Sequence, residues 1–117
     1  MENGSSSLYW YALRTKSRFE KVVRGELMRR GIEQLLPTIT RTSQWKDRKK
    51  QIEWPLFPGY CFARFSTEQK LIVLQTPGII EIVGGGSRPE PIEEEEMEAL
   101  RRMISSHRYY DPYPYLN

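Results

Sequence analysis

The chain has 117 residues, of which 28% are charged and 38% hydrophobic. It is therefore long enough for one domain with its own core, too short for two, and unlike a disordered chain in composition. Residues 1–70 hold fourteen Lys and Arg against seven Asp and Glu, a balance of +7, whereas residues 71–117 hold four against eight, a balance of −4. The basic part is where we expect a polyanion such as nucleic acid to bind, although solvated helix surfaces explain the charge equally well.

Cysteine content and hydropathy narrow the class of protein further. The single cysteine, Cys61, excludes a disulfide framework and a thiolate metal site, and its place in an apolar strand pattern is typical of a small buried residue. No signal-peptide pattern opens the chain, and no apolar run approaches the ~20 residues of a membrane span. We therefore expect a soluble cytoplasmic protein without membrane contact.

The first predicted elements are a strand and a helix, which follow a polar leader at residues 1–7. LYWYAL, residues 8–13, is a short apolar and aromatic run typical of a strand. Ser17 followed by Glu20 matches a capping box, so a helix is expected to begin there. Gly31 supplies the left-handed residue that ends this helix. Its predicted buried stripe comprises Phe19, Val22, Val23 and Leu27.

Two further strands are expected next, joined as a hairpin. Residues 35–45 are rich in β-branched side chains and contain Pro37, which suits a strand start or a strand edge. The charged residues 46–50 predict the hairpin tip. After two more prolines, residues 59–65 predict the regular part of the third strand.

A short helix and a fourth strand are predicted after the hairpin. Ser66 and Gln69 match a second capping box, and the helix that they open must end before Pro77. Pro77 and Gly78 then predict a tight turn. The turn leads into the fourth strand, at residues 79–83.

The last predicted elements are a loop at residues 84–91 and a third helix that opens at Pro91. Glutamates at 93–96 suit its first turn, because the helix dipole favours acids there. Its inward stripe is predicted to comprise Met97, Leu100 and Ile104. The order β α β β α β α predicts an α+β, ferredoxin-like split βαβ fold, also found in RNA-recognition motifs, with a four-stranded antiparallel sheet and three helices.

Evidence for an enzyme is weak. The only histidine, His107, lies next to the tail, and the successive helical glutamates at 93–96 cannot converge on one metal ion. GGGSR at 84–88 lacks the Lys and Ser/Thr of a phosphate loop. An acylphosphatase-like enzyme on this fold would need an anion loop that the chain lacks. We therefore predict a non-enzyme with no catalytic residues, no metal site and no cofactor.

The strand at residues 59–65 carries the strongest binding signal. Because side chains alternate along a strand, one face receives Tyr60, Phe62 and Arg64 and the other Cys61, Ala63 and Phe65. The second set suits the core beneath the helices. The first set is close to the RNA-recognition signature, in which alternating aromatic rings stack bases. One hypothesis is thus a single-stranded RNA-binding module; the alternative is that the third helix or Trp10 covers these rings.

Several segments together resemble the N-terminal domain of the NusG family of transcription elongation factors. In the family's order they are WYAL at 10–13, Phe19-Glu20 in the capped helix, PLFPGY at 55–60, TPGI at 76–79 and RPEPI at 88–92 before an acidic helix. The resemblance covers about residues 8–106, and the combination is far more specific than any one segment. The PLFP form and the PYPYL end are similar to specialised paralogues of the RfaH and UpxY type, which act on selected operons.

The resemblance implies a partner as well as a fold. Such domains bind the clamp helices of the largest subunit of RNA polymerase through an apolar depression and suppress pausing or termination. The matching residues for this depression are Phe57, Tyr60, Phe62 and Trp10. Pro58 and Gly59 are expected to bend the chain so that Phe57 and Tyr60 stand together.

The resemblance also implies contact with the non-template DNA strand of the transcription bubble. The matching residues are Lys16, Arg18, Arg41, Lys46, Arg48, Lys49, Lys50, Gln75 and Thr76. Residues 107–117 are similar to a linker toward a KOW domain, which lies outside this sequence. In full-length family members that domain contacts the ribosome or the termination factor Rho.

Overall fold

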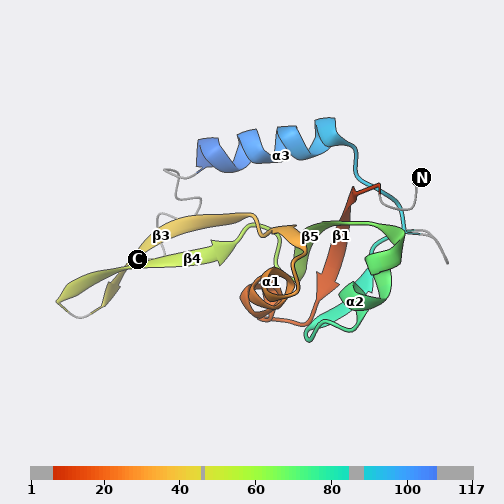
Figure 1. Ribbon diagram of the computed structural model, residues 1–117. Coiled ribbons are helices and arrows are strands. Elements are labelled where there is room, and N and C mark those ends of the chain that lie inside the picture. Colours follow the sequence, from red (N-terminus) through yellow and green to blue (C-terminus); the bar gives the residue numbers. More distant parts are fainter. Residues whose placement is uncertain (1–6, 46, 85–88, 108–117) are drawn as a thin grey trace.

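The computed structural model describes residues 7–45, 47–84 and 89–107, and its centre is a four-stranded antiparallel sheet (Figure 1). The strand order is β2-β5-β1-β6, with bounds Glu33–Leu35, Tyr60–Phe65, Tyr9–Thr15 and Ile79–Ile82. Every neighbouring pair is antiparallel. With three α-helices in the described ranges, this confirms the predicted α+β, ferredoxin-like class. Residues 1–6 of the predicted leader and 108–117 of the predicted linker lie outside the described residues.

One face of the sheet packs against α1 (Glu20–Arg29) and α2 (Lys70–Leu74), and the core lies between sheet and helices (Figure 1). The predicted alternation along β5 is confirmed, because Cys61, Ala63 and Phe65 are all buried on this face. The other core residues are Tyr11, Leu13, Val23, Leu27, Ile32, Leu36 and Val73. Removal of this apolar surface from water is the main stabilising contribution to the fold.

Helix α1 begins differently from the prediction and ends as predicted. Its N-cap is Phe19, without a side-chain cap, so the expected capping box at Ser17 is wrong. The reason is that the Glu20 carboxylate accepts a hydrogen bond from the backbone N–H of Gly59, at 2.7 Å, and is buried in doing so. Phe19 and Val22 are exposed, so the buried stripe is narrower than expected. Gly31 ends the helix at φ +73° in a Schellman-type turn, as predicted.

The predicted strand at 35–45 is in fact two strands. β2 ends at Leu35 inside the main sheet, whereas β3 (Thr38–Trp45) pairs with β4 (Arg48–Pro55) in a separate two-stranded sheet. Pro37 lies between them and has no N–H to donate to a ladder. Its carbonyl instead accepts from the backbone N–H of Leu56, at 2.7 Å. The β3–β4 hairpin projects away from the main sheet (Figure 1).

The hairpin tip is shorter than predicted. Strand pairing continues to Trp45 and Arg48, so three of the five residues assigned to the tip at 46–50 lie on β4. Lys46 lies outside the described residues. Long β-ladders continue wherever backbone partners remain, and a run of charged side chains does not prevent this on an exposed ribbon.

The second capping box is confirmed. The Gln69 side chain accepts from the backbone N–H of Ser66, at 3.0 Å, and opens the 3₁₀ turn η2 (Thr67–Gln69) before α2. Helix α3 (Glu94–His107) starts later than expected, because Ile92 is used as extended backbone that bridges to Trp10 of β1. Met97 is fully buried, and Leu100 and Ile104 are half-buried. Among the described residues, no helix combines the length and the apolar character that crossing a membrane requires.

Candidate docking and nucleic-acid interfaces

The sheet face opposite the core carries the aromatic residues singled out from the sequence. In the register of β1 with β5, Arg14 pairs with Tyr60 and Ala12 with Phe62, so these side chains share that second face. Tyr60 is 38% exposed, and Phe62 and Phe57 are half-buried. The Phe57 and Phe62 rings meet edge to face, with centroids 6.2 Å apart and planes at 80°. An apolar surface is therefore partly open to solvent.

The Pro58-Gly59 bend holds this surface in place. Gly59 has φ +84°, which glycine adopts without the penalty of a side chain. Its N–H donates to the Glu20 carboxylate and its carbonyl accepts from the N–H of Thr15, at 2.8 Å. The N–H of Tyr60 donates to the carbonyl of Phe57, at 3.0 Å, which closes a tight turn. The bend thus places Phe57 beside β5, where its ring contacts that of Phe62.

Trp10 lies on the same face but is covered. Only 2% of it is exposed, and the Arg101 guanidinium of α3 lies 5.3 Å from the centre of its ring. The backbone N–H of Ile92 also donates to the carbonyl of Trp10, at 2.7 Å. Helix α3 therefore covers the Trp10 end of the face and leaves the Phe62 end open. The Trp10 ring, expected to be part of the apolar depression, is therefore not open to solvent.

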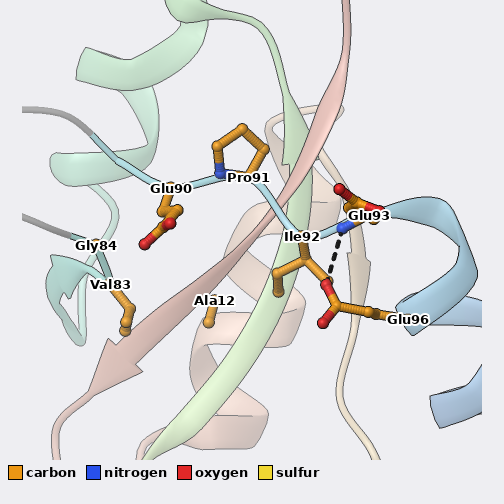
Figure 2. Close-up of a pocket in the computed structure, with 8 residues that line it drawn as sticks. All are labelled: Ala12, Val83, Gly84, Glu90, Pro91, Ile92, Glu93 and Glu96. Atoms are coloured by element: carbon orange, nitrogen blue, oxygen red, sulfur yellow. Dashed lines mark hydrogen bonds between the residues drawn. The ribbon is translucent and has the colours of Figure 1, made fainter.

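A hollow of about 550 Å³ lies beside β1, between the end of β6 and the segment that leads into α3 (Figure 2). Its floor includes Ala12, the register partner of Phe62. The other lining residues are Val83, Gly84, Glu90, Pro91, Ile92, Glu93 and Glu96. A carboxylate oxygen of Glu96 accepts from the backbone N–H of Glu93, at 3.1 Å, at the start of α3 (Figure 2). The hollow is therefore apolar at its floor and acidic along its rim.

Part of the predicted nucleic-acid set gathers where β1 ends. The N–H of Lys16 donates to the carbonyl of Gly78, at 2.8 Å, which joins this loop to the turn after α2. Arg18 has φ +66°, a left-handed conformation that is uncommon for a residue with a side chain. Gln75 is exposed, but Thr76 is buried and its hydroxyl donates to the carbonyl of Ile72, at 2.9 Å. Lys16, Arg18 and Gln75 are thus the residues of this group that present side chains to solvent.

The remaining predicted cations lie on the hairpin, away from this loop (Figure 1). Arg41 is on β3, and Arg48, Lys49 and Lys50 are exposed on β4. The predicted nucleic-acid residues therefore form two separate groups instead of one.

Comparison with known proteins identifies the family. The family model described as "Transcription termination factor nusG" matches residues 8–101. The chain belongs to the NusG family. Transcription termination/antitermination protein NusG of Halalkalibacterium halodurans is 28% identical over 109 residues, which cover 81% of this chain and 61% of that protein. The protein of the same name from Streptococcus pyogenes serotype M1 is 30% identical over 105 residues, 78% of this chain and 59% of the relative.

A solved structure supports the fold of this NusG-family domain. "Domain interaction in Thermotoga maritima NusG" superimposes with a TM-score of 0.60 at 24% identity, over 88% of this chain and 60% of that one. The chain thus spans about three fifths of the length of the relatives that it matches.

An ion cluster that sequence reasoning missed fixes the hairpin of this NusG-family domain to α1. The Glu53 carboxylate of β4 accepts two hydrogen bonds from the Arg24 guanidinium, at 3.1 and 3.3 Å, and one from the Thr38 hydroxyl, at 2.9 Å. Lys21 lies 4.0 Å away. These contacts, the Arg24 hydrogen bonds first, lower the pKa of Glu53 below its ordinary value of 4.5. No local pattern could reveal the cluster, because its partners are far apart in sequence.

The Glu53 cluster predicts a pH dependence of the hairpin base. Because the folded-state pKa is lowered, the ionised carboxylate stabilises the folded protein above pH 4.5, and this contribution is lost as the pH falls through the lowered pKa. The expected contribution is only about 1 kcal/mol, because the Glu53 side chain is 38% exposed. Hydrogen exchange of the β3–β4 amides at pH 6 and pH 3 measures it. Glu53→Gln should remove the difference; an unchanged pH response in that variant would contradict the assignment.

Cys61 is a free cysteine in the core. Its thiol is fully buried beneath the helices, and burial raises its pKa to about 12. It is therefore protonated and inert near neutral pH, as expected of a small core residue. In the described ranges, no group of three or more His, Cys, Asp or Glu could hold a metal ion.

Proposed function

We propose that this NusG-family domain is a non-catalytic transcription factor module that docks on RNA polymerase and suppresses pausing or termination. The observation that carries the proposal is the partly exposed aromatic surface of Phe57, Tyr60 and Phe62 on the face opposite the core, where Ala12, the register partner of Phe62, also lines the hollow. A contiguous apolar surface of this kind on a folded domain is typical of a partner site. Family membership supports RNA polymerase as the partner, and the work would take place in the bacterial cytoplasm.

The docked element in this proposal is the pair of clamp helices of the largest polymerase subunit. An amphipathic helix buries its apolar side in a groove, and aromatic anchors in such grooves supply much of the binding energy. Helix α3 and the Ile92 segment would form one wall, and Phe57 and Tyr60 the other. The acidic rim at Glu90, Glu93 and Glu96 would favour a partner with basic residues beside its apolar stripe.

The proposal also includes contact with the non-template DNA strand of the transcription bubble. Lys16, Arg18 and Gln75 supply one set of exposed side chains, and the hairpin supplies a second. Contacts of cations with phosphates are sensitive to salt and carry little sequence information. Contacts with the ribosome or Rho would belong to a KOW domain and are no part of this proposal.

Docking predicts a selective loss of binding. Tyr60→Ala and Phe62→Ala should each weaken retention of RNA polymerase by about 30-fold or more, equivalent to ~2 kcal/mol, because each removes an aromatic anchor. The measurement is a pull-down with purified core polymerase, combined with circular dichroism to verify folding. Tyr9→Ala is the matched control, since Tyr9 is an exposed aromatic residue on the opposite side of β1.

Two outcomes would reject the docking proposal. The first is unchanged polymerase retention by both folded variants. The second is tight binding of a short single-stranded RNA that depends on Tyr60 and Phe62 in the absence of polymerase. That result would favour an RNA-binding module of the RNA-recognition type, because such modules stack bases on exposed sheet aromatics.

A further inference from the structure

The two faces of the β3–β4 hairpin differ in chemistry. In the register of the ladder, Ile39 pairs with Trp54, Arg41 with Ile52 and Trp45 with Arg48. Because side chains alternate along each strand, one face carries, from base to tip, the buried Ile39 with Trp54, then Arg41 with Ile52, then Lys50 and Arg48. We call it the Trp54 face. The other face presents Thr38, Thr40, Thr42, Gln44, Lys49, Gln51 and Glu53.

Positive charge is concentrated on the Trp54 face. The residues of this face include three cations, Arg41, Lys50 and Arg48, and no acid. The opposite face carries one cation, Lys49, and one acid, Glu53, whose carboxylate binds Arg24 and Lys21 of α1. That ion cluster joins the base of the opposite face to α1, and at the base of the Trp54 face Ile39 is buried as well. The Trp54 face therefore has the charge expected of a surface for a polyanion.

Trp54 adds an aromatic surface to this charge. It is 46% exposed, although it stands next to the buried Ile39 at the base of the hairpin. The Arg41 guanidinium lies over the indole, 5.3 Å from the ring centre. An exposed indole with a guanidinium beside it is a surface on which an unpaired base can stack, and both groups contribute to such binding.

We propose that the Trp54 face binds single-stranded nucleic acid, with one base stacked at Trp54 and the phosphates along Arg41, Lys50 and Arg48 toward the tip. Lys50 and Arg48 are two apart on β4 and so about 7 Å apart, and Arg41 of β3 pairs with Ile52, the next β4 residue of this face toward the base. A duplex is the less suitable ligand, because its bases are stacked on one another and an indole reaches them only after costly unstacking. The proposal deepens the DNA contact of the proposed function, on which it rests for the source of the unpaired strand.

The test is fluorescence anisotropy of a labelled oligothymidylate with the whole chain, over a range of salt concentrations. Trp54→Leu keeps an apolar side chain but removes the ring, and it should weaken binding about 5- to 20-fold. Trp54→Phe should stay within about 3-fold of the original affinity. Neither change removes a cation, so the slope of log K against log salt should stay unchanged.

Charge variants complete the experiment. Arg48→Ala with Lys50→Ala should reduce the salt slope by roughly 0.7 for each cation that no longer neutralises a phosphate. Arg29→Ala is the matched control, because the Arg29 side chain of α1 is 77% exposed and belongs to neither proposed contact set, and it should leave the slope unchanged. Equal weakening in Trp54→Leu and Trp54→Phe would mean that the indole only packs the hairpin, and it would overturn the proposal. Tighter binding of a duplex, indifferent to Trp54, would overturn it as well.

The experiments distinguish failure of the nucleic-acid proposal for the Trp54 face from failure of the polymerase-docking proposal. Trp54→Leu should retain RNA polymerase in the pull-down, whereas Tyr60→Ala should lose polymerase and keep its affinity for the oligonucleotide. Loss of both activities in Trp54→Leu would indicate a disturbed hairpin base and would contradict a stacking role.

Discussion

Phe65→Ala is expected to lower the free energy of unfolding by about 3–5 kcal/mol, the usual cost of removing a large aromatic side chain from a core. Phe65 is 1% exposed, and its ring lies 4.6 Å from that of Tyr11, centre to centre. The cavity beneath α1 and α2 would be bordered by rigid neighbours that cannot collapse to fill it. Urea unfolding followed by circular dichroism measures the change.

Phe62 supplies the matched comparison, because it is the same residue type on the other face of the same strand. It is half-buried, so Phe62→Ala should cost less than about 2 kcal/mol of stability while it impairs polymerase docking. Phe65→Ala should cost more stability, and under conditions where the protein remains folded it should leave polymerase docking unimpaired. If Phe62→Ala destabilised the chain as much as Phe65→Ala, the second face would be a structural core and the docking surface would not exist.

Gly78→Ala is expected to destabilise the domain by about 3 kcal/mol, for two independent reasons. Gly78 has φ +93°, a backbone conformation that L side chains rarely adopt. A Cβ there would also lie 2.8 Å from Cγ2 of Val23 and 3.1 Å from Cδ2 of Phe19, both on or next to α1. Since Val23 is fully buried, it cannot move aside. Thermal unfolding should show a midpoint lower by roughly 10–20 °C.

Gly25 is the control for Gly78. It lies within α1, and a Cβ added there meets no atom within 4 Å. Gly25→Ala should therefore stabilise the domain by about 0.5–1 kcal/mol, because alanine is the better helix former. Equal stability of the two alanine variants would contradict the strained turn. Gly78 also accepts from the N–H of Lys16, so its substitution should disturb the loop that carries Lys16 and Arg18.

Much of the candidate site was predictable, because strand alternation is a local property. The division of β5 into Tyr60, Phe62 and Arg64 against Cys61, Ala63 and Phe65 follows from the period of two, and the burial of the second set confirms it. The Pro58-Gly59 bend was also expected from the sequence. The hairpin cations were identified as well, but not their separation onto two faces, which depends on the pairing of β3 with β4.

The wrong predictions share a different cause. Glu20 looked like part of a capping box, but its carboxylate binds Gly59, which is 39 positions away in the chain. Trp10 looked like part of an exposed depression, but α3 packs over it. The strand expected at 35–45 divides at Pro37, and only its first part finds a partner in β5.

By itself the sequence determined the local structure of this NusG-family domain: the left-handed end of α1 at Gly31, the capping box at Ser66 and Gln69, and the alternation along β5. Each depends on the backbone conformation and hydrogen bonds of a few neighbouring residues. Only the tertiary structure decided that Trp10 is covered while Tyr60 stays open, and that Glu53 ties the hairpin to α1. Burial and ion pairing depend on where distant segments lie in the folded structure, and no short stretch of sequence contains both partners of such a contact.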